Sequence, residues 1–283
     1  MKNIHSQLIE RFIREMEYRN YSPRSIQSYS SLLSKVESYY NQPLDKITGR
    51  QIKEYLHGRI MADKISVTMV NQYISAYKIL QVDILQRDWE QIRIKRPRKE
   101  QRIPVVLSGE EVERLIKATA NIKHRAILML AYSSGLRRQE VQFIKPSAID
   151  SSRMQIHVVQ GKGKKDRYTI LAKKTLEILR EYYKWERPTT YLFEAQGRKG
   201  QNLSESTLNN IIKQGVKKAW INKNISFHTL RHSFATHLLE KGVNLRLIQQ
   251  FMGHTSLKTT SLYLHIANVN PGTITSPLDS MDL

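Results

Sequence analysis

Four short polar stretches of the chain hold the side chains best suited to chemistry on a phosphodiester. They are GLRRQE at 135–140, GKGKKDR at 161–167, HTLRHSFATH at 228–237 and MGHTSLKTTSLY at 252–263. Cationic and hydrogen-bond-donating side chains can bind one phosphate while a tyrosine hydroxyl attacks it, so such a set could break a DNA strand without a metal. The six candidate side chains are Arg137, Lys162, His228, Arg231, His254 and Tyr263.

Two arginines in these stretches could hold a phosphate between them. A guanidinium offers a planar fork of donors and stays charged at any working pH. Arg231 follows His228 by three positions in a predicted helix, so these two side chains share a face. A pair of arginines would also stabilise the extra negative charge of a pentavalent transition state. A single arginine is more often part of a surface salt bridge, and the residues alone do not choose between Arg137 and Arg138.

Tyr263 is the candidate nucleophile. A phenol is weak near neutral pH because its reference pKa is about 10, so it needs a base or a cationic phosphate site beside it. His228 and His254 could serve as a general base and a phosphate donor. The chain has 14 tyrosines, and most tyrosines are core or surface residues, so the residue type alone does not select this one.

Lys162 lies in a predicted turn between two strand-like segments, 154–160 and 167–172, which read as a β-hairpin. From this turn it could donate a proton to a 5′-oxygen leaving group, while Lys164 and Lys165 are predicted to contact the DNA backbone. A nucleotide-binding phosphate loop would need Ser or Thr after the lysine and a helix behind it. Here a strand follows, so we reject that alternative.

A metal site is disfavoured, and no cofactor is expected. His228, His232 and His237 cluster on one predicted helix, but HTLRH lacks the glutamate of an HExxH motif and no carboxylate nearby completes a ligand set. The chain has no cysteine, which also excludes a disulfide framework and a thiol nucleophile. His232 and His237 are expected to be structural or to lie near the phosphate.

The charge balance favours a polyanionic partner. There are 46 Lys and Arg against 25 Asp and Glu, a formal net charge of +21, and binding to nucleic acid through these cations should weaken steeply with salt. Residues 1–100 hold 18 of the cations and 11 of the acids, so both halves could face DNA, as in a clamp. No signal peptide or membrane span is expected, and the predicted location is cytoplasmic.

The predicted organisation is two domains joined by a basic linker. Residues 1–91 read as a helical bundle, with a Ser22–Pro23 helix start and a capping box at Thr48 and Gln51. Residues 92–104 are predicted to be an extended linker near phosphates, since proline and dense like charge argue against a packed element. The cations of this linker are Arg93, Lys95, Arg96, Arg98, Lys99 and Arg102.

The second domain is predicted to span 105–270 and to be mostly helical, with a tail at 271–283. Ser108 and Glu111 have the spacing of a capping box, and the apolar run 126–136 should form a buried helix. Further helices are predicted at about 173–185, 205–219, 229–241 and 245–252. With the hairpin, this gives a mainly α fold: an all-α N-terminal bundle and a mostly α catalytic domain with a small antiparallel β-sheet.

The four stretches together resemble the conserved motifs of the tyrosine recombinases, also called the phage integrase family, with the Xer-type members most similar in layout. HxLRHxxATH followed by GHxSxxTTxxY is the specific part, and it places Tyr263 nine positions after His254. The segment NYSPRSIQSYSSLLSKVESYY also resembles the first-helix segment of the family's N-terminal core-binding, SAM-like domain. The resemblance covers about residues 5–265.

The resemblance implies a metal-free reaction in which Tyr263 attacks the scissile phosphate and forms a 3′-phosphotyrosyl bond. It implies that Arg137 and Arg231 bind the phosphate, that Lys162 is the general acid and that His228 assists proton transfer. His254 would donate to a phosphate oxygen, and Glu140 would support the active-site arginine. Strand exchange through a Holliday junction, within a homotetramer on two specific duplexes, would follow, with accessory or directionality proteins as possible partners and association with the nucleoid.

Two alternatives remain open at this point. A DNA-binding regulator could keep the fold without catalysis, although all six expected residues are present. An enzyme similar to type IB topoisomerases could nick and close DNA with the same tyrosine chemistry and no partner duplex. A requirement for two specific sites would separate recombination from nicking and closing.

Overall fold

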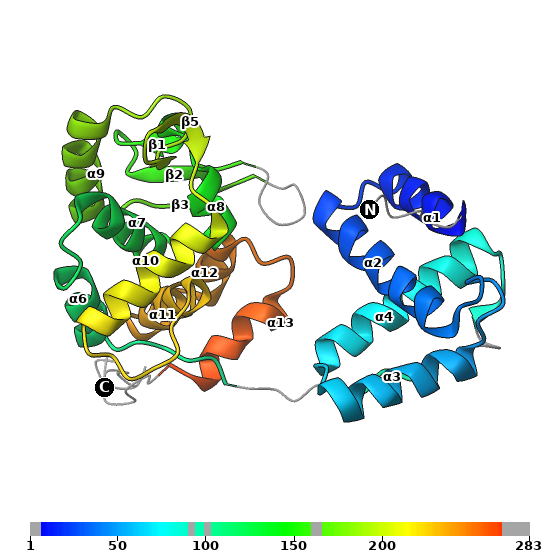
Figure 1. Cartoon of the computed structure of the whole chain (residues 1–283). Coiled ribbons are helices and arrows are strands. Elements are labelled where there is room, and N and C mark those ends of the chain that lie inside the picture. The colour runs from blue at the N-terminus through cyan, green and yellow to red at the C-terminus, as the bar shows by residue number, and fades with distance from the viewer. Residues whose placement is uncertain (1–6, 90–93, 99–102, 160–165, 268–283) are drawn as a thin grey trace, which may run out of the picture. The chain divides into compact units, whose positions relative to one another are not determined.

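The structure is a computed structural model that describes residues 7–89, 94–98, 103–159 and 166–267. The chain divides into two compact units, Met1–Arg102 and Ile103–Leu283, whose helices and strands are labelled in Figure 1. Each unit has a hydrophobic core of its own. Among the described residues, no helix has both the length and the apolar character that crossing a membrane requires.

The described part of the N-terminal unit is helical. Ser22 accepts a hydrogen bond from the backbone N–H of Ser25, with Pro23 in the first turn, which confirms the predicted helix start. Thr48 and Gln51 form the predicted capping box. The helices are α1 (Gln7–Tyr18), α2 (Pro23–Tyr40), α3 (Gly49–Asp63) and α4 (Val67–Ile79), the last running into a π-helical turn at Leu80–Ile84.

The second unit combines helices with two small antiparallel sheets. One sheet has the order β1 (Ile149–Asp150), β2 (Gln155–Val158), β3 (Arg167–Ile170), and the other pairs β4 (Glu194–Ala195) with β5 (Arg198–Asn202). Three helices precede the first sheet: α6 (Gly109–Lys117), α7 (Ile122–Ser133) and α8 (Arg138–Phe143), followed by a 3-10 turn at Pro146–Ala148. Helix α9 (Lys173–Glu186) lies between the two sheets in the chain. After the second sheet come α10 (Glu205–Lys218), α11 (Phe227–Glu240), α12 (Leu245–Met252), α13 (Leu257–Thr260) and a 3-10 helix at Ser261–His265.

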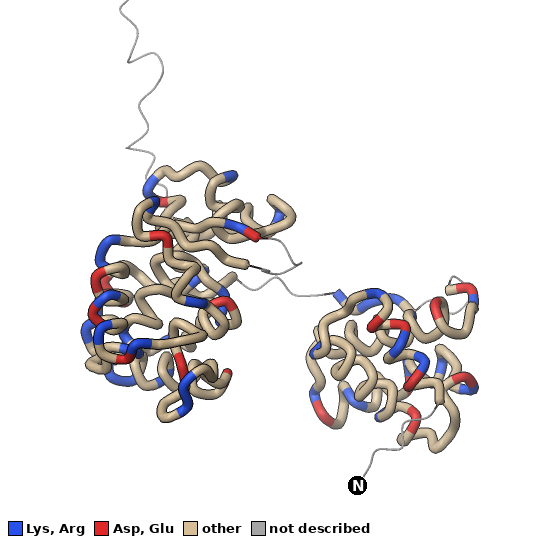
Figure 2. Tube along the Cα trace, turned by 90° about the horizontal axis from the view of Figure 1, so that it is seen from above, with Lys and Arg blue, Asp and Glu red and all other residues tan. Residues whose placement is uncertain are grey.

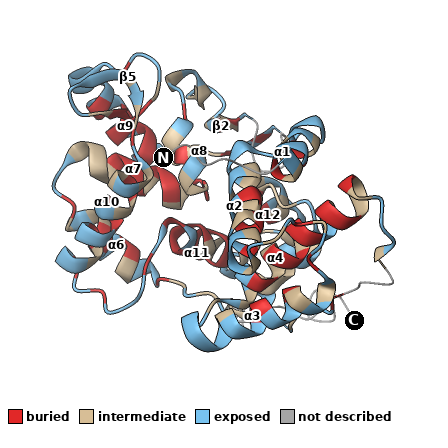
Figure 3. Cartoon of the chain, turned by 45° about the vertical axis from the view of Figure 1, so that its right-hand side comes forward, coloured by how far each residue is buried: buried red, intermediate tan, exposed pale blue. Residues whose placement is uncertain are grey.

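Two buried helices form the centre of this unit. Figure 3 shows α7 and α11 as largely buried, and α7 carries the predicted apolar run, including Ile127 and Leu130, in the core. The N-terminal half of α11 packs in the same core through Phe227 and Leu230. Its next turn packs in a second apolar cluster that includes Phe234, Met252 and Tyr263. Helix α11 therefore links the main core to the segment that carries the candidate nucleophile.

The predicted mainly α fold is confirmed, and so are the capping box at Ser108 and Glu111 and the β2–β3 hairpin. The sequence reading missed β1 and the β4–β5 pair. β1 is two residues long and pairs with β2 only through Ile149 and Asp150. Such short strands have no room for the apolar and polar alternation that marks a strand in a sequence.

Lys and Arg residues occur along the chain of both units, as the blue segments of the trace in Figure 2 show. Of the linker cations, Lys95, Arg96 and Arg98 lie among the described residues and are exposed. Arg96 donates hydrogen bonds to the Asn71 backbone and side-chain oxygens and to Ser75 Oγ on α4. Its guanidinium is thus held by α4. Arg93, Lys99 and Arg102 lie outside the described residues.

Candidate active site

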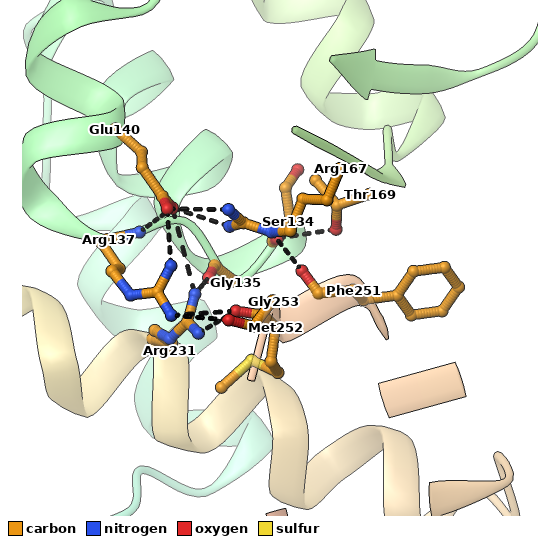
Figure 4. Close-up of polar contacts among 10 residues, drawn as sticks. All are labelled: Ser134, Gly135, Arg137, Glu140, Arg167, Thr169, Arg231, Phe251, Met252 and Gly253. Atoms are coloured by element: carbon orange, nitrogen blue, oxygen red, sulfur yellow. Dashed lines mark hydrogen bonds and ion pairs between the residues drawn. The ribbon is translucent and has the colours of Figure 1, made fainter. Parts of the chain in front are cut away.

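Glu140 is the centre of an arginine network in the second unit (Figure 4). It stands at the third position of α8, where one carboxylate oxygen accepts a hydrogen bond of 2.7 Å from the backbone N–H of Arg137. The Arg137 guanidinium donates to the other oxygen at 2.7 Å. The same carboxylate therefore caps the helix and orients the first of the two predicted phosphate-binding arginines.

Arg167 belongs to this network and was not among the residues predicted for the site. It donates through Nη1 and Nη2 to the two oxygens of Glu140, each at 2.7 Å, and through Nε to the Phe251 carbonyl at 2.8 Å. Only 7% of its side chain is exposed. It is the last residue of the GKGKKDR stretch. The alternation of polar and apolar residues in β3 would place Tyr168 and Ile170 inward, whereas the structure buries Arg167 and Thr169, so the local pattern gave no signal for it.

The ionisation of Glu140 follows from these partners. Burial alone would raise the pKa of this carboxyl, but the hydrogen bonds and charge of Arg167, with further help from Arg137, hold it at about 2. Glu140 is thus a carboxylate throughout the neutral range. A buried carboxylate with bidentate guanidinium contact is a strongly oriented group, so it fixes Arg137 and Arg167 in place.

Arg231 approaches the same point from α11. Its guanidinium donates to the Gly135 carbonyl at 2.5 Å and to the Met252 carbonyl, and it lies 4.0 Å from Glu140. Arg137 donates to the carbonyls of Met252 and Gly253 at 3.2 and 3.1 Å. Burial and the charge of Arg137 lower the pKa of Arg231 to about 9, which leaves it cationic at neutral pH. The two guanidiniums thus meet at the end of α12.

Gly253 lets the backbone pass close to Arg167. It ends α12 with φ +59°, and an added Cβ would lie 2.7 Å from Arg167 Cδ. We expect Gly253→Ala to cost about 1–2 kcal/mol for the left-handed backbone, to displace Arg167 and to lower DNA cleavage. Gly242→Ala is the matched control, since Gly242 also has positive φ but an added Cβ meets open space. Equal activity of the two variants in a cleavage assay would contradict a role for this contact.

Tyr263 is almost fully buried, with 1% of its surface exposed. Its hydroxyl is 3.0 Å from His232 Nδ1. The ring of His254 stacks on it, with centroids 6.4 Å apart and planes at 11°, while His254 Nδ1 is 2.9 Å from Thr260 Oγ1. Burial raises the pKa of Tyr263 to about 12, against the opposing effect of the charges of Arg231 and Arg137.

The three histidines of the site are neutral at pH 7. Burial, reinforced by Arg231 and other positive neighbours, lowers the pKa of His254 to about 3. Burial and His228 lower the pKa of His232 to about 4. Loss of solvation and the charge of Arg231 lower the pKa of His228. A site with this surplus of guanidiniums disfavours further positive charge and is suited to an anion.

The structure brings together six of the residues predicted for the site: Arg137, Glu140, His228, Arg231, His254 and Tyr263. All six are joined by the contacts and electrostatic interactions described above, and His228 also lies one turn before His232 on α11. Lys162, Lys164 and Lys165 lie outside the described residues, in the connection between β2 and β3. Among the described residues, no group of three or more histidine or carboxylate side chains is placed to hold a metal ion.

Comparison with known proteins agrees with this architecture. Residues 105–269 match the phage integrase family, and residues 8–91 match the N-terminal SAM-like domain of phage integrases. A tyrosine recombinase of Thermosipho africanus is 34% identical, over 88% of this chain and 91% of the relative.

Two solved structures are also similar. The crystal structure of XerA recombinase is 31% identical, with a TM-score of 0.55, over 93% of this chain and 94% of the other. XerH site-specific recombinase bound to a palindromic difH substrate is 24% identical, with a TM-score of 0.70, over 92% and 81%, and it shows the likeness of fold. The family match spans more than half of the chain, and the identity to recombinases extends over most of its length. The chain therefore belongs to the phage integrase family and is a tyrosine-type site-specific recombinase.

Proposed function

We propose that the chain cuts and rejoins duplex DNA through a covalent bond between Tyr263 and the 3′-phosphate of the cleaved strand. The observation that carries the proposal is the place of Tyr263, which packs in one cluster with Met252. The carbonyl of Met252 accepts hydrogen bonds from both Arg137 and Arg231. Those guanidiniums would bind the scissile phosphate and favour the charge that develops on attack.

The remaining roles are those that the family resemblance implies. Lys162 would protonate the departing 5′-oxygen, because an ammonium can supply the proton that this leaving group needs. His228 would assist proton transfer, and His254, held through Nδ1 near Thr260, would donate to a phosphate oxygen. Glu140 would act by holding Arg137. The attack stores the energy of the phosphodiester in the phosphotyrosyl bond, so rejoining would require no nucleotide.

We expect specific recombination sites in duplex DNA as substrate and a homotetramer on two duplexes, with strand exchange through a Holliday junction. Backbone phosphates of the DNA would be contacted by the cations of the linker and of the segment between β2 and β3: Arg93, Lys95, Arg98, Lys99, Arg102, Lys164 and Lys165. Arg96 would contribute less, because its guanidinium is hydrogen-bonded to α4. Such contacts position DNA without reading its sequence. Accessory or directionality proteins would act on this assembly, on nucleoid DNA in the cytoplasm.

Covalent capture of DNA would test the proposal. The purified protein is mixed, in EDTA, with a pool of random-sequence duplexes that carry nicks to trap the intermediate, and protein-linked DNA is recovered after denaturation. We expect wild type to capture DNA and mass spectrometry to find the nucleotide on the peptide that contains Tyr263. Tyr263→Phe should capture none, whereas Tyr168→Phe, at an exposed tyrosine of β3, should behave as wild type.

Each other outcome has a definite meaning. Capture by Tyr263→Phe would overturn the choice of nucleophile. Specific binding without capture by wild type would favour a DNA-binding regulator. Rejoining that needs only one site would favour a nicking-closing enzyme over a recombinase.

A further inference from the structure

His232 contacts the atom that would attack the phosphate. It follows Arg231 on α11, and its Nδ1 is 3.0 Å from the hydroxyl oxygen of Tyr263. Among the described residues, His232 is the side chain that hydrogen-bonds to the hydroxyl of Tyr263. The Nδ1 of His254 is instead 2.9 Å from Thr260 Oγ1. The group in place to receive the phenolic proton is therefore a histidine outside the six predicted residues.

The chemistry of the contact suits proton acceptance. A phenol whose pKa is raised by burial carries its proton at neutral pH and must lose it on attack. A neutral imidazole has one nitrogen with a free lone pair, and burial and positive neighbours keep His232 neutral in the DNA-free protein. The hydroxyl can therefore donate to Nδ1.

Binding of DNA would make this acceptor stronger. The charged or titratable groups that face His232 are His228 and Arg231 on its own helix, Tyr263 from the 3-10 helix beyond α13 and His254 from the segment between α12 and α13. In the DNA-free protein the positive charge of Arg231 disfavours an imidazolium. A bound phosphodiester brings negative charge to this point, and its transition state brings more, and a nearby negative charge favours the protonated imidazole.

We propose that His232 is the base that accepts the proton of Tyr263 through Nδ1 when Tyr263 attacks, and that it returns this proton on rejoining. The inference rests on the proposed function. In cleavage, the bond from Tyr263 oxygen to phosphorus forms, the phenolic proton passes to His232, the bond to the 5′-oxygen breaks, and Lys162 supplies the proton of the new 5′-hydroxyl. In rejoining, each transfer is reversed.

The test compares single-turnover cleavage of one duplex taken from the covalent capture pool, so that wild type is active on it by construction. We expect His232→Leu to lower the cleavage rate by about 10²- to 10⁴-fold. His232→Asn, whose amide can still hydrogen-bond the hydroxyl but cannot take its proton, should be nearly as slow. Both variants should bind the duplex and melt much as wild type does.

A matched control lies on the same helix. His237 Nδ1 is 2.9 Å from the Tyr132 hydroxyl, the same type of partly buried contact away from Tyr263. His237→Leu should therefore lose a comparable hydrogen bond and still cleave at close to the wild-type rate. This variant separates a loss of proton acceptance from the general effect of removing a histidine–tyrosine pair from α11.

A duplex with a 5′-bridging sulfur at the scissile phosphate identifies the side of the reaction on which His232 acts. A thiolate leaves without protonation, so this substrate should restore cleavage by Lys162→Ala but not by His232→Leu. A wild-type cleavage rate in His232→Asn would mean that His232 only positions the hydroxyl of Tyr263, and would overturn its role as the base. Rescue of His232→Leu by sulfur, or a wild-type rate of this variant on the ordinary duplex, would overturn the proposal. Absence of capture by wild type would instead be a failure of the proposed function.

Discussion

Replacing Arg137 with glutamine is expected to lower single-turnover cleavage by about 10³- to 10⁵-fold, the range for an arginine that stabilises phosphoryl-transfer charge, while Arg138→Gln leaves the rate close to wild type. The two residues are adjacent in sequence but point to different partners. Arg137 is held by Glu140 in the network of Figure 4. Arg138 pairs with Glu205 of α10 at 2.6 Å.

The measurement is the rate of covalent adduct formation at saturating protein on a captured duplex, with binding followed separately. Because glutamine keeps a hydrogen-bond donor but loses the charge, the variant at Arg137 should still bind DNA while losing the chemical step. A similar loss in Arg138→Gln would mean that the charge of this segment as a whole matters, and would remove the distinction that we draw between the two arginines.

Glu140→Gln is expected to lower the free energy of unfolding by about 3 kcal/mol at pH 7, the value that corresponds to a carboxyl pKa near 2 in place of 4.5. The substitution leaves the buried Arg167 and the partly buried Arg137 without their common anion, and removing one partner of a buried ion pair usually costs several kcal/mol. Cleavage should fall as well, since the orientation of Arg137 depends on this carboxylate.

The pH dependence of this stabilisation has a fixed sign. The folded-state pKa of Glu140 is depressed, so its contribution is complete above the unfolded value of 4.5 and is lost as the pH falls toward 2. Denaturation in urea, followed by circular dichroism, should therefore show a gap between wild type and Glu140→Gln that is widest at pH 6–7 and closes in acid. A gap that does not change with pH would contradict an ionised Glu140 as its source.

Glu111→Gln is the matched control for that experiment. Glu111 holds the same capping-box position in α6 that Glu140 holds in α8. Its charged partner is Lys223 at 2.6 Å, which is much more exposed than Arg167, and pairs near the surface contribute about 1 kcal/mol or less. The control should thus lose less stability than Glu140→Gln and leave cleavage unchanged.

Local features of this protein could be predicted because their causes lie within a few residues. The caps at Ser22, Thr48 and Ser108 depend on a side chain and a backbone N–H three positions away. The buried helix α7 depends on an apolar run. Strands that are paired over only a few residues, such as β4 and β5, carry no such signal and were not predicted.

The same distinction between local and long-range causes applies to the candidate site. The motifs pointed to Arg137, Arg231, His254 and Tyr263, and the structure places all four in one region. The partners of these residues could not be read from spacing. Arg167 reaches Glu140 across 27 positions of sequence, and His232 reaches Tyr263 across 31. Contacts at such separations depend on how β3, α8 and α11 pack, not on the sequence next to either residue.

By itself, the sequence determined the family, the mainly α fold, the basic charge and the residue types of the candidate site, because motif identity, periodicity and composition are local or additive properties. Tertiary structure decided that a third arginine anchors Glu140, that Tyr263 is buried and that His232 contacts its hydroxyl. Each of these depends on burial and on a partner distant in sequence, and both arise only when separate segments pack together.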